Sequence, residues 1–134
     1  MSPLAAEKST LRVLVVDDEP LIRWSVCEML GESGHSVSEA TDGASTVELL
    51  SDGSRLFDVI VLDYRLPDSN DLHLLETIRE LAPESAVIMT TAFGTPEMVA
   101  GALERGVYRV VPKPFDMHDI VRLVTGAPRT HRGS

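Results

Sequence analysis

The chain has 134 residues, of which 43% are hydrophobic and 25% charged, a balance typical of one folded domain rather than a disordered segment. Its formal net charge is −9, which argues against direct binding of nucleic acid, because phosphate contacts need lysine and arginine. Cys27 is the only cysteine, so no intramolecular disulfide can form, as expected in the cytoplasm. We find no signal peptide and no apolar run of about 20 residues that could cross a bilayer. We therefore expect a cytoplasmic protein without membrane contact.

Short apolar runs, rich in β-branched residues, alternate with helical patterns along the chain. The predicted strands cover residues 11–16, 36–40, 58–62, 86–89 and 108–111. Four of these runs are apolar on both faces, as in a buried parallel sheet, whereas residues 36–40 alternate like an edge strand.

A predicted helix follows each strand. The first carries an apolar stripe from Ile22 and ends before Gly31, and the third stops at Pro83. Asp42 is the expected N-cap of the second helix, and Thr95 of the fourth, which ends at Gly106. The fifth covers residues 117–124. Five strand–helix units predict an α/β fold with a doubly wound parallel sheet over residues 11–124. Residues 1–10 are expected to be a disordered tail and residues 125–134 a linker or tail.

Polar residues follow four of the predicted strands. Asp17 and Asp18 come after the first strand, Asp63 after the third, Thr91 after the fourth and Lys113 after the fifth. In parallel α/β sheets the carboxyl ends of the strands line the ligand crevice, so these side chains should converge. Two carboxylates about 5 Å apart repel by roughly 3 kcal/mol at an effective dielectric near 20. A hard divalent cation such as Mg²⁺, or Mn²⁺, would offset that repulsion.

Each of these residues also has an ordinary structural interpretation. An aspartate pair after a strand is often a solvated turn or a helix cap, and Asp63 could belong to a turn with Pro67. A single lysine is usually a surface residue. The functional interpretation depends on all of them meeting at one edge of one sheet.

Four segments resemble the receiver domain of two-component response regulators: VLVVDDEPLIR (13–23), VIVLDYRLPD (59–68), VIMTTAFG (87–94) and VVPKPFD (110–116). Their order and spacing agree with the family over residues 11–124. The resemblance implies a flavodoxin-like (βα)₅ fold with strand order 2-1-3-4-5. The phrases DEPLIRW, DYRLPDSNDL and VPKPFD most resemble receivers of enhancer-binding, nitrogen-regulator-type transcription activators.

The resemblance also implies roles for individual residues. Asp63 would be the phosphoacceptor, and Asp17, Asp18, Asp63 and the Arg65 backbone carbonyl would hold Mg²⁺. Thr91 and Lys113 would contact the phosphoryl group.

The family further implies a cis Lys113–Pro114 bond. The phosphodonor would be a histidine kinase or a phosphotransfer protein. Phosphorylation would switch a surface made by the fourth helix, fifth strand and fifth helix. This surface would contact an output domain in cis or a second copy and control transcription. The domain would be regulatory and not an enzyme.

Two features depart from the family pattern. Val110 stands where an aromatic residue is usual, although Tyr108 is expected on the same strand face. Arg65 and Phe93, two residues beyond Asp63 and Thr91, are both bulky and would limit the access of hydrolytic water. We therefore predict a long-lived phosphoryl group.

Three other functions are weighed against this one. A pseudo-receiver would bind partners without phosphorylation, but its usual mark is loss of the acidic residues. A phosphohydrolase of the haloacid-dehalogenase type would carry D-x-D after the first strand, where this chain has DDE. A flavodoxin would cradle phosphate in a Ser/Thr/Gly-rich loop there, and DDEP would repel it.

Overall fold

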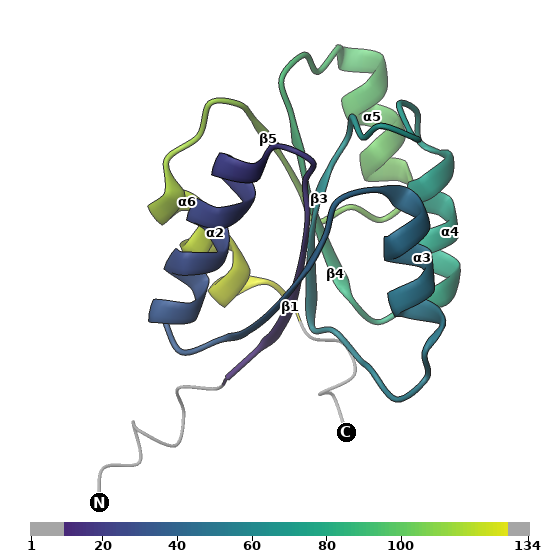
Figure 1. The fold of residues 1–134 in the computed structure, drawn as a ribbon. Helices are drawn as coiled ribbons and strands as arrows, with labels where there is room; N and C mark the ends of the chain where they lie inside the picture. Colours follow the sequence, from purple (N-terminus) through teal and green to yellow (C-terminus); the bar gives the residue numbers. More distant parts are fainter. Residues whose placement is uncertain (1–9, 129–134) are drawn as a thin grey trace, which may run out of the picture.

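The computed structural model describes residues 10–128. Within them a five-stranded parallel sheet in the order β2-β1-β3-β4-β5 lies between two helical layers (Figure 1). The strands are β1 (Arg12–Val16), β2 (Ser36–Ala40), β3 (Val59–Asp63), β4 (Ala86–Thr91) and β5 (Arg109–Pro112). The helices are α2 (Pro20–Glu32), α3 (Gly43–Ser51), α4 (His73–Leu81), α5 (Pro96–Glu104) and α6 (Met117–Gly126). The predicted fold class and strand order are confirmed.

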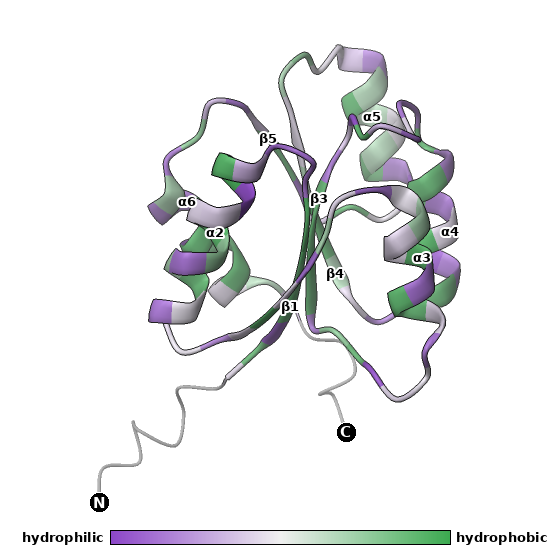
Figure 2. Cartoon of the chain, in the orientation of Figure 1, coloured by the Kyte–Doolittle hydropathy of each residue, from purple (hydrophilic) through white to green (hydrophobic). Residues whose placement is uncertain are grey.

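The sheet separates two hydrophobic cores. Successive side chains of each inner strand point to opposite faces of the sheet, so each inner strand contributes to both cores. In β1, Val13 and Val15 pack on one side, while Leu14 and Val16 pack on the other. Helices α2 and α6 cover the first side, and α3, α4 and α5 cover the second (Figure 1). The inner strands are mainly apolar, whereas polar residues lie on the outer helical faces (Figure 2). Strand β2 is only partly buried, as an edge strand should be.

Side-chain caps fix the beginnings of two helices as predicted. Asp42 accepts a hydrogen bond from the Ser45 backbone N–H at 2.8 Å. Thr95 accepts one from Met98 at 3.1 Å. Each cap satisfies a backbone donor that the first helical turn leaves unpaired.

Two helices end later than the sequence pattern predicts. Helix α2 continues through Gly31 to Glu32, because a single glycine weakens a helix without ending it and Leu30 is fully buried. The chain turns instead at Gly34, whose φ of +94° favours glycine. Helix α6 reaches Gly126, and Ala127 beyond it is buried. Residues 125–126, expected in a tail, are therefore helical.

Of the other expected tail residues, 1–9 and 129–134 lie outside the described part of the chain, whereas 10, 127 and 128 lie within it. No helix among residues 10–128 has both the length and the apolar character to cross a membrane.

Candidate metal and phosphoryl site

The polar residues that follow the strands meet at one edge of the sheet. Asp18, Asp63, Thr91 and Lys113 line a single open cavity of about 430 Å³. Asp17 lies beside it, buried and in contact with Lys113. Parallel strands bring their carboxyl ends to the same edge, which is why residues up to 96 positions apart in sequence become neighbours.

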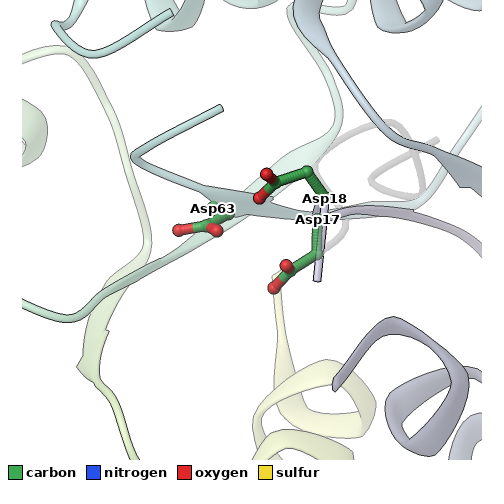
Figure 3. Close-up of side chains that lie close together, drawn as sticks. All are labelled: Asp17, Asp18 and Asp63. Atoms are coloured by element: carbon green, nitrogen blue, oxygen red, sulfur yellow. The ribbon is translucent and has the colours of Figure 1, made fainter. Parts of the chain in front are cut away.

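The three aspartates form a compact acidic trio. One oxygen from each of Asp17, Asp18 and Asp63 lies within 4.8 Å of the others. In Figure 3 their side chains extend from the ends of β1 and β3 into the same small space. Asp17 and Asp63 are buried, whereas Asp18 is exposed. The trio thus has two desolvated carboxylates and one that faces water.

Hydrogen bonds to both the side chain and the backbone of Asp17 hold the loop after β1 in place. Asp17 Oδ1 accepts a hydrogen bond from the Glu19 N–H at 2.8 Å. Arg23, from α2, donates to the Asp17 carbonyl at 2.8 Å and to Glu39 Oε1 on β2 at 2.9 Å. These bonds hold the Asp17 carboxylate in a fixed orientation toward the cavity.

Lys113 places its ammonium among three carboxylates. Its Nζ lies 3.1 Å from Asp63 Oδ2, 3.2 Å from Asp17 Oδ2 and 2.6 Å from Glu19 Oε1. Burial alone would lower the pKa of Lys113, but the hydrogen bonds to Glu19 and Asp63 and the nearby charges raise it above its usual value. Lys113 therefore stays positively charged.

Burial opposes the ionisation of both buried aspartates. It raises the pKa of Asp63 to about 6, with a further contribution from the negative charge of Asp17, while Lys113 and the Arg65 N–H act in the opposite direction. Burial also raises the pKa of Asp17. One lysine thus offsets only part of the repulsion within the trio.

The donor set of the site suits a hard divalent ion. Carboxylate oxygens are the ligands that Mg²⁺ prefers, and the open cavity leaves room for its retained waters. A cation there would oppose the effects of burial and of the Asp17 charge, which together raise the pKa of Asp63. The acidic trio could therefore bind a divalent metal.

Arg65 is tied to the acidic site through its backbone. Its N–H points to Asp63 Oδ1 at 3.3 Å, and the residue lines the cavity with an exposed side chain. Its backbone carbonyl as a metal ligand stays a prediction.

The loop after β4 packs closely around Thr91. The Thr91 hydroxyl oxygen accepts a hydrogen bond from the Phe93 N–H at 3.2 Å. A Cβ added to Gly94 would lie 3.1 Å from Thr91 Cγ2, closer than ordinary van der Waals contact. There is therefore little free space between Thr91 and Gly94. The Phe93 side chain is 80% exposed at the cavity rim.

Val110 and Tyr108 belong to opposite sides of the sheet. Val110 packs against the core beneath α3, α4 and α5, whereas Tyr108 packs against the core beneath α2 and α6. The prediction that they share a face is wrong, because Tyr108 precedes β5 and the strand alternation begins only at Arg109. Tyr108 therefore cannot take the place of the aromatic residue that the family usually has at the position of Val110. The Lys113–Pro114 bond is cis, as expected.

Sequence reasoning missed three residues that shape this edge of the sheet. They are Glu19, which pairs with Lys113, Arg23, which holds the Asp17 backbone, and Asp68, which binds the start of α3. Asp68 accepts hydrogen bonds from the N–H groups of Gly43 at 2.7 Å and Ala44 at 3.0 Å. Glu19 could have been found from its place in the DDE motif. The Asp68 contact spans 25 residues and leaves no local signal.

Comparison with known proteins gives concordant matches. The response regulator receiver domain family matches residues 13–125. The DNA-binding transcriptional regulator NtrC of Escherichia coli K12 is 35% identical over 115 residues, covering 86% of this chain and 24% of its own length.

Solved structures agree with this match. A CheY-like receiver domain protein from Methanospirillum hungatei JF-1 superposes with a TM-score of 0.81 at 27% identity, covering 87% of this chain and 91% of that one. The DrrB receiver domain, solved as BeF3-activated, superposes with a TM-score of 0.76 at 29% identity, covering 87% and 95%. The chain spans about a quarter of the length of the NtrC relatives it matches.

Proposed function

This chain belongs to the response regulator receiver domain family, and from that premise we propose that Asp63 accepts a phosphoryl group from a histidine kinase or a phosphotransfer protein. The observation that carries the proposal is the position of the Asp63 carboxylate. It is buried at the edge of a cavity, within 4.8 Å of two further carboxylates and 3.1 Å from Lys113 Nζ. An aspartate so placed can act as a nucleophile toward phosphorus.

The transfer would be a displacement at phosphorus. An Asp63 oxygen forms the new P–O bond as the P–N bond to the donor imidazole breaks, and the leaving nitrogen keeps the bonding electron pair. Lys113 and Thr91 both line the cavity. Each would make one contact with a phosphoryl oxygen, Lys113 through its ammonium and Thr91 through its hydroxyl. A divalent ion held by the acidic trio would neutralise the charge that accumulates on these oxygens.

The loop after β4 would carry the signal to the output surface. Attraction of the Thr91 hydroxyl toward the phosphoryl group would draw Phe93 with it, because the Phe93 N–H donates to this hydroxyl, and would shift the adjoining Gly94. That loop leads directly into α5. The surface of α5, β5 and α6, the fourth helix, fifth strand and fifth helix in chain order, would respond.

The output we propose is control of transcription. The NtrC relatives are DNA-binding transcriptional regulators about four times as long as the matched region. A receiver of this kind would act on an output domain in cis or through a second copy of itself. With a net charge of −9, it would leave DNA contact to another domain.

Intact-mass measurement tests the proposal. Incubation with acetyl phosphate and Mg²⁺ should add one phosphoryl group to the wild-type chain. The same treatment of Asp63→Asn, or of the wild type in EDTA, should add none. An unmodified wild-type chain under conditions that phosphorylate a known receiver would overturn the proposal and favour a pseudo-receiver. Sustained release of p-nitrophenol from p-nitrophenyl phosphate would favour a phosphohydrolase instead.

A further inference from the structure

Lys113 makes its shortest carboxylate contact with a residue outside the acidic trio. Its Nζ lies 2.6 Å from Glu19 Oε1, compared with 3.1 Å to Asp63 and 3.2 Å to Asp17. An ammonium group has three N–H donors, and these three contacts use all of them. A phosphoryl group on Asp63 therefore has to compete with Asp17 and Glu19 for the N–H donors of Lys113.

The Glu19 contact costs least to break. The side chains of Asp17 and Asp63 are each 6% exposed, whereas that of Glu19 is 55% exposed. A buried carboxylate that loses its partner stays desolvated and unpaired. The Glu19 carboxylate can instead turn into water, where solvent replaces the lysine.

Hydrogen bonding fixes the backbone of Glu19, whereas its exposed side chain can leave Lys113 for water. Its N–H donates to Asp17 Oδ1 at 2.8 Å, and the residue is the N-cap of α2. N-cap side chains commonly accept a hydrogen bond from the first helical turn, yet Glu19 makes no such bond. Its carboxylate is directed to Lys113 instead.

We propose that Glu19 competes with the phosphoryl group for Lys113 and thereby stabilises the unphosphorylated state of the receiver. The inference rests on the proposed phosphorylation of Asp63. When Asp63 carries a phosphoryl group, Lys113 exchanges Glu19 for a phosphoryl oxygen, and the Glu19 carboxylate moves into solvent. Glu19 is a positioning residue, because it acts on the site through Lys113.

Titration calorimetry with beryllofluoride, a noncovalent mimic of the phosphoryl group, at saturating Mg²⁺ tests this competition. We expect Glu19→Gln to bind beryllofluoride about two- to fivefold more tightly than the wild type, which is the range that an exposed ion pair contributes to an equilibrium constant. Glu19→Ala should behave in the same way, and thermal unfolding checks that both variants are folded.

Two controls separate the competition from a general charge effect. Glu76→Gln removes the same charge from a carboxylate that is 48% exposed and pairs with Arg105, away from the site, so it should leave the affinity unchanged. In a Lys113→Ala background, Glu19→Gln should no longer raise the affinity, because the contact is already absent.

The possible outcomes are distinct. An unchanged affinity in Glu19→Gln and Glu19→Ala overturns the inference, as does an equal gain in Glu76→Gln or in the Lys113→Ala background. A wild-type chain that neither binds beryllofluoride nor gains a phosphoryl group overturns the proposed function as well.

Discussion

Replacing the Asp63 carboxylate with the neutral amide of asparagine should stabilise the metal-free protein at neutral pH. Burial and the nearby charge of Asp17 raise the pKa of Asp63 from 3.8 to about 6. The folded state thus holds this proton more tightly than the unfolded state does. The free energy of unfolding should therefore fall as the pH rises from about 4 to about 6, because the unfolded chain releases its proton first.

The magnitude follows from the size of that pKa difference. One pKa unit corresponds to about 1.4 kcal/mol, so an ionised Asp63 costs the fold about 3 kcal/mol above pH 6. Asp63→Asn removes this cost but also takes a charged partner from Lys113, which keeps Asp17 and Glu19. The pKa of about 6 already includes the attraction between Asp63 and Lys113, so no further loss is subtracted and the net gain is about 3 kcal/mol.

Urea unfolding in EDTA at pH 5 and pH 7.5 measures the effect. Asp63→Asn should be more stable than the wild type at pH 7.5 by about 3 kcal/mol, which corresponds to a melting temperature about 10 °C higher in a parallel thermal scan, and the difference should shrink at pH 5. Asp18→Asn is the matched control, since the exposed Asp18 carboxylate keeps its water. Excess Mg²⁺ should reduce the difference in stability between Asp63→Asn and the wild type, because it binds and stabilises the wild type more than the variant. The reasoning fails if Asp63→Asn is equally stable or less stable in EDTA at pH 7.5.

Three further predictions concern neighbouring residues. Lys113→Met should lower the stability at pH 7.5 in EDTA, because Asp17 and Asp63 lose their shared cation; chemical denaturation showing no loss would contradict this. Asp68→Ala should cost about 1 kcal/mol in urea unfolding, since two N–H groups at the start of α3 lose their acceptor, and an unchanged midpoint would count against it. The phosphoryl group should last longer in the wild type than in the Arg65→Ala, Phe93→Ala double variant, as measured by the loss of phosphoryl mass over time. Equal half-lives would show that these two side chains do not limit the access of water.

The architecture and the edge that carries the site could be predicted because both depend on local patterns. Each inner strand shows as an apolar run, and the alternation of strands with helices implies parallel crossovers. Once the sheet is parallel, the residue after each strand must lie at one edge. Asp18, Asp63 and Thr91 were placed together by that argument alone.

The contacts that tune the site could not be predicted, because they depend on side-chain direction between distant segments. The sequence places Glu19 near Asp17 but does not show that its side chain reaches Lys113, 94 residues later. Arg23 lies on the first helix, and only the packing of that helix against β1 and β2 directs its guanidinium to Asp17 and Glu39. Such pairings are set by tertiary structure.

The error at Tyr108 has a similar origin and bears on signalling. Period-2 alternation applies only inside a strand, and Tyr108 lies one residue before β5 begins. With Tyr108 on the far side and the aliphatic Val110 on the near side, no aromatic side chain in β5 can swing between the phosphoryl site and α5. If Thr91 moves on phosphorylation, as we propose, the loop that begins with Phe93 offers a direct route to α5, because the Phe93 N–H donates to the Thr91 hydroxyl.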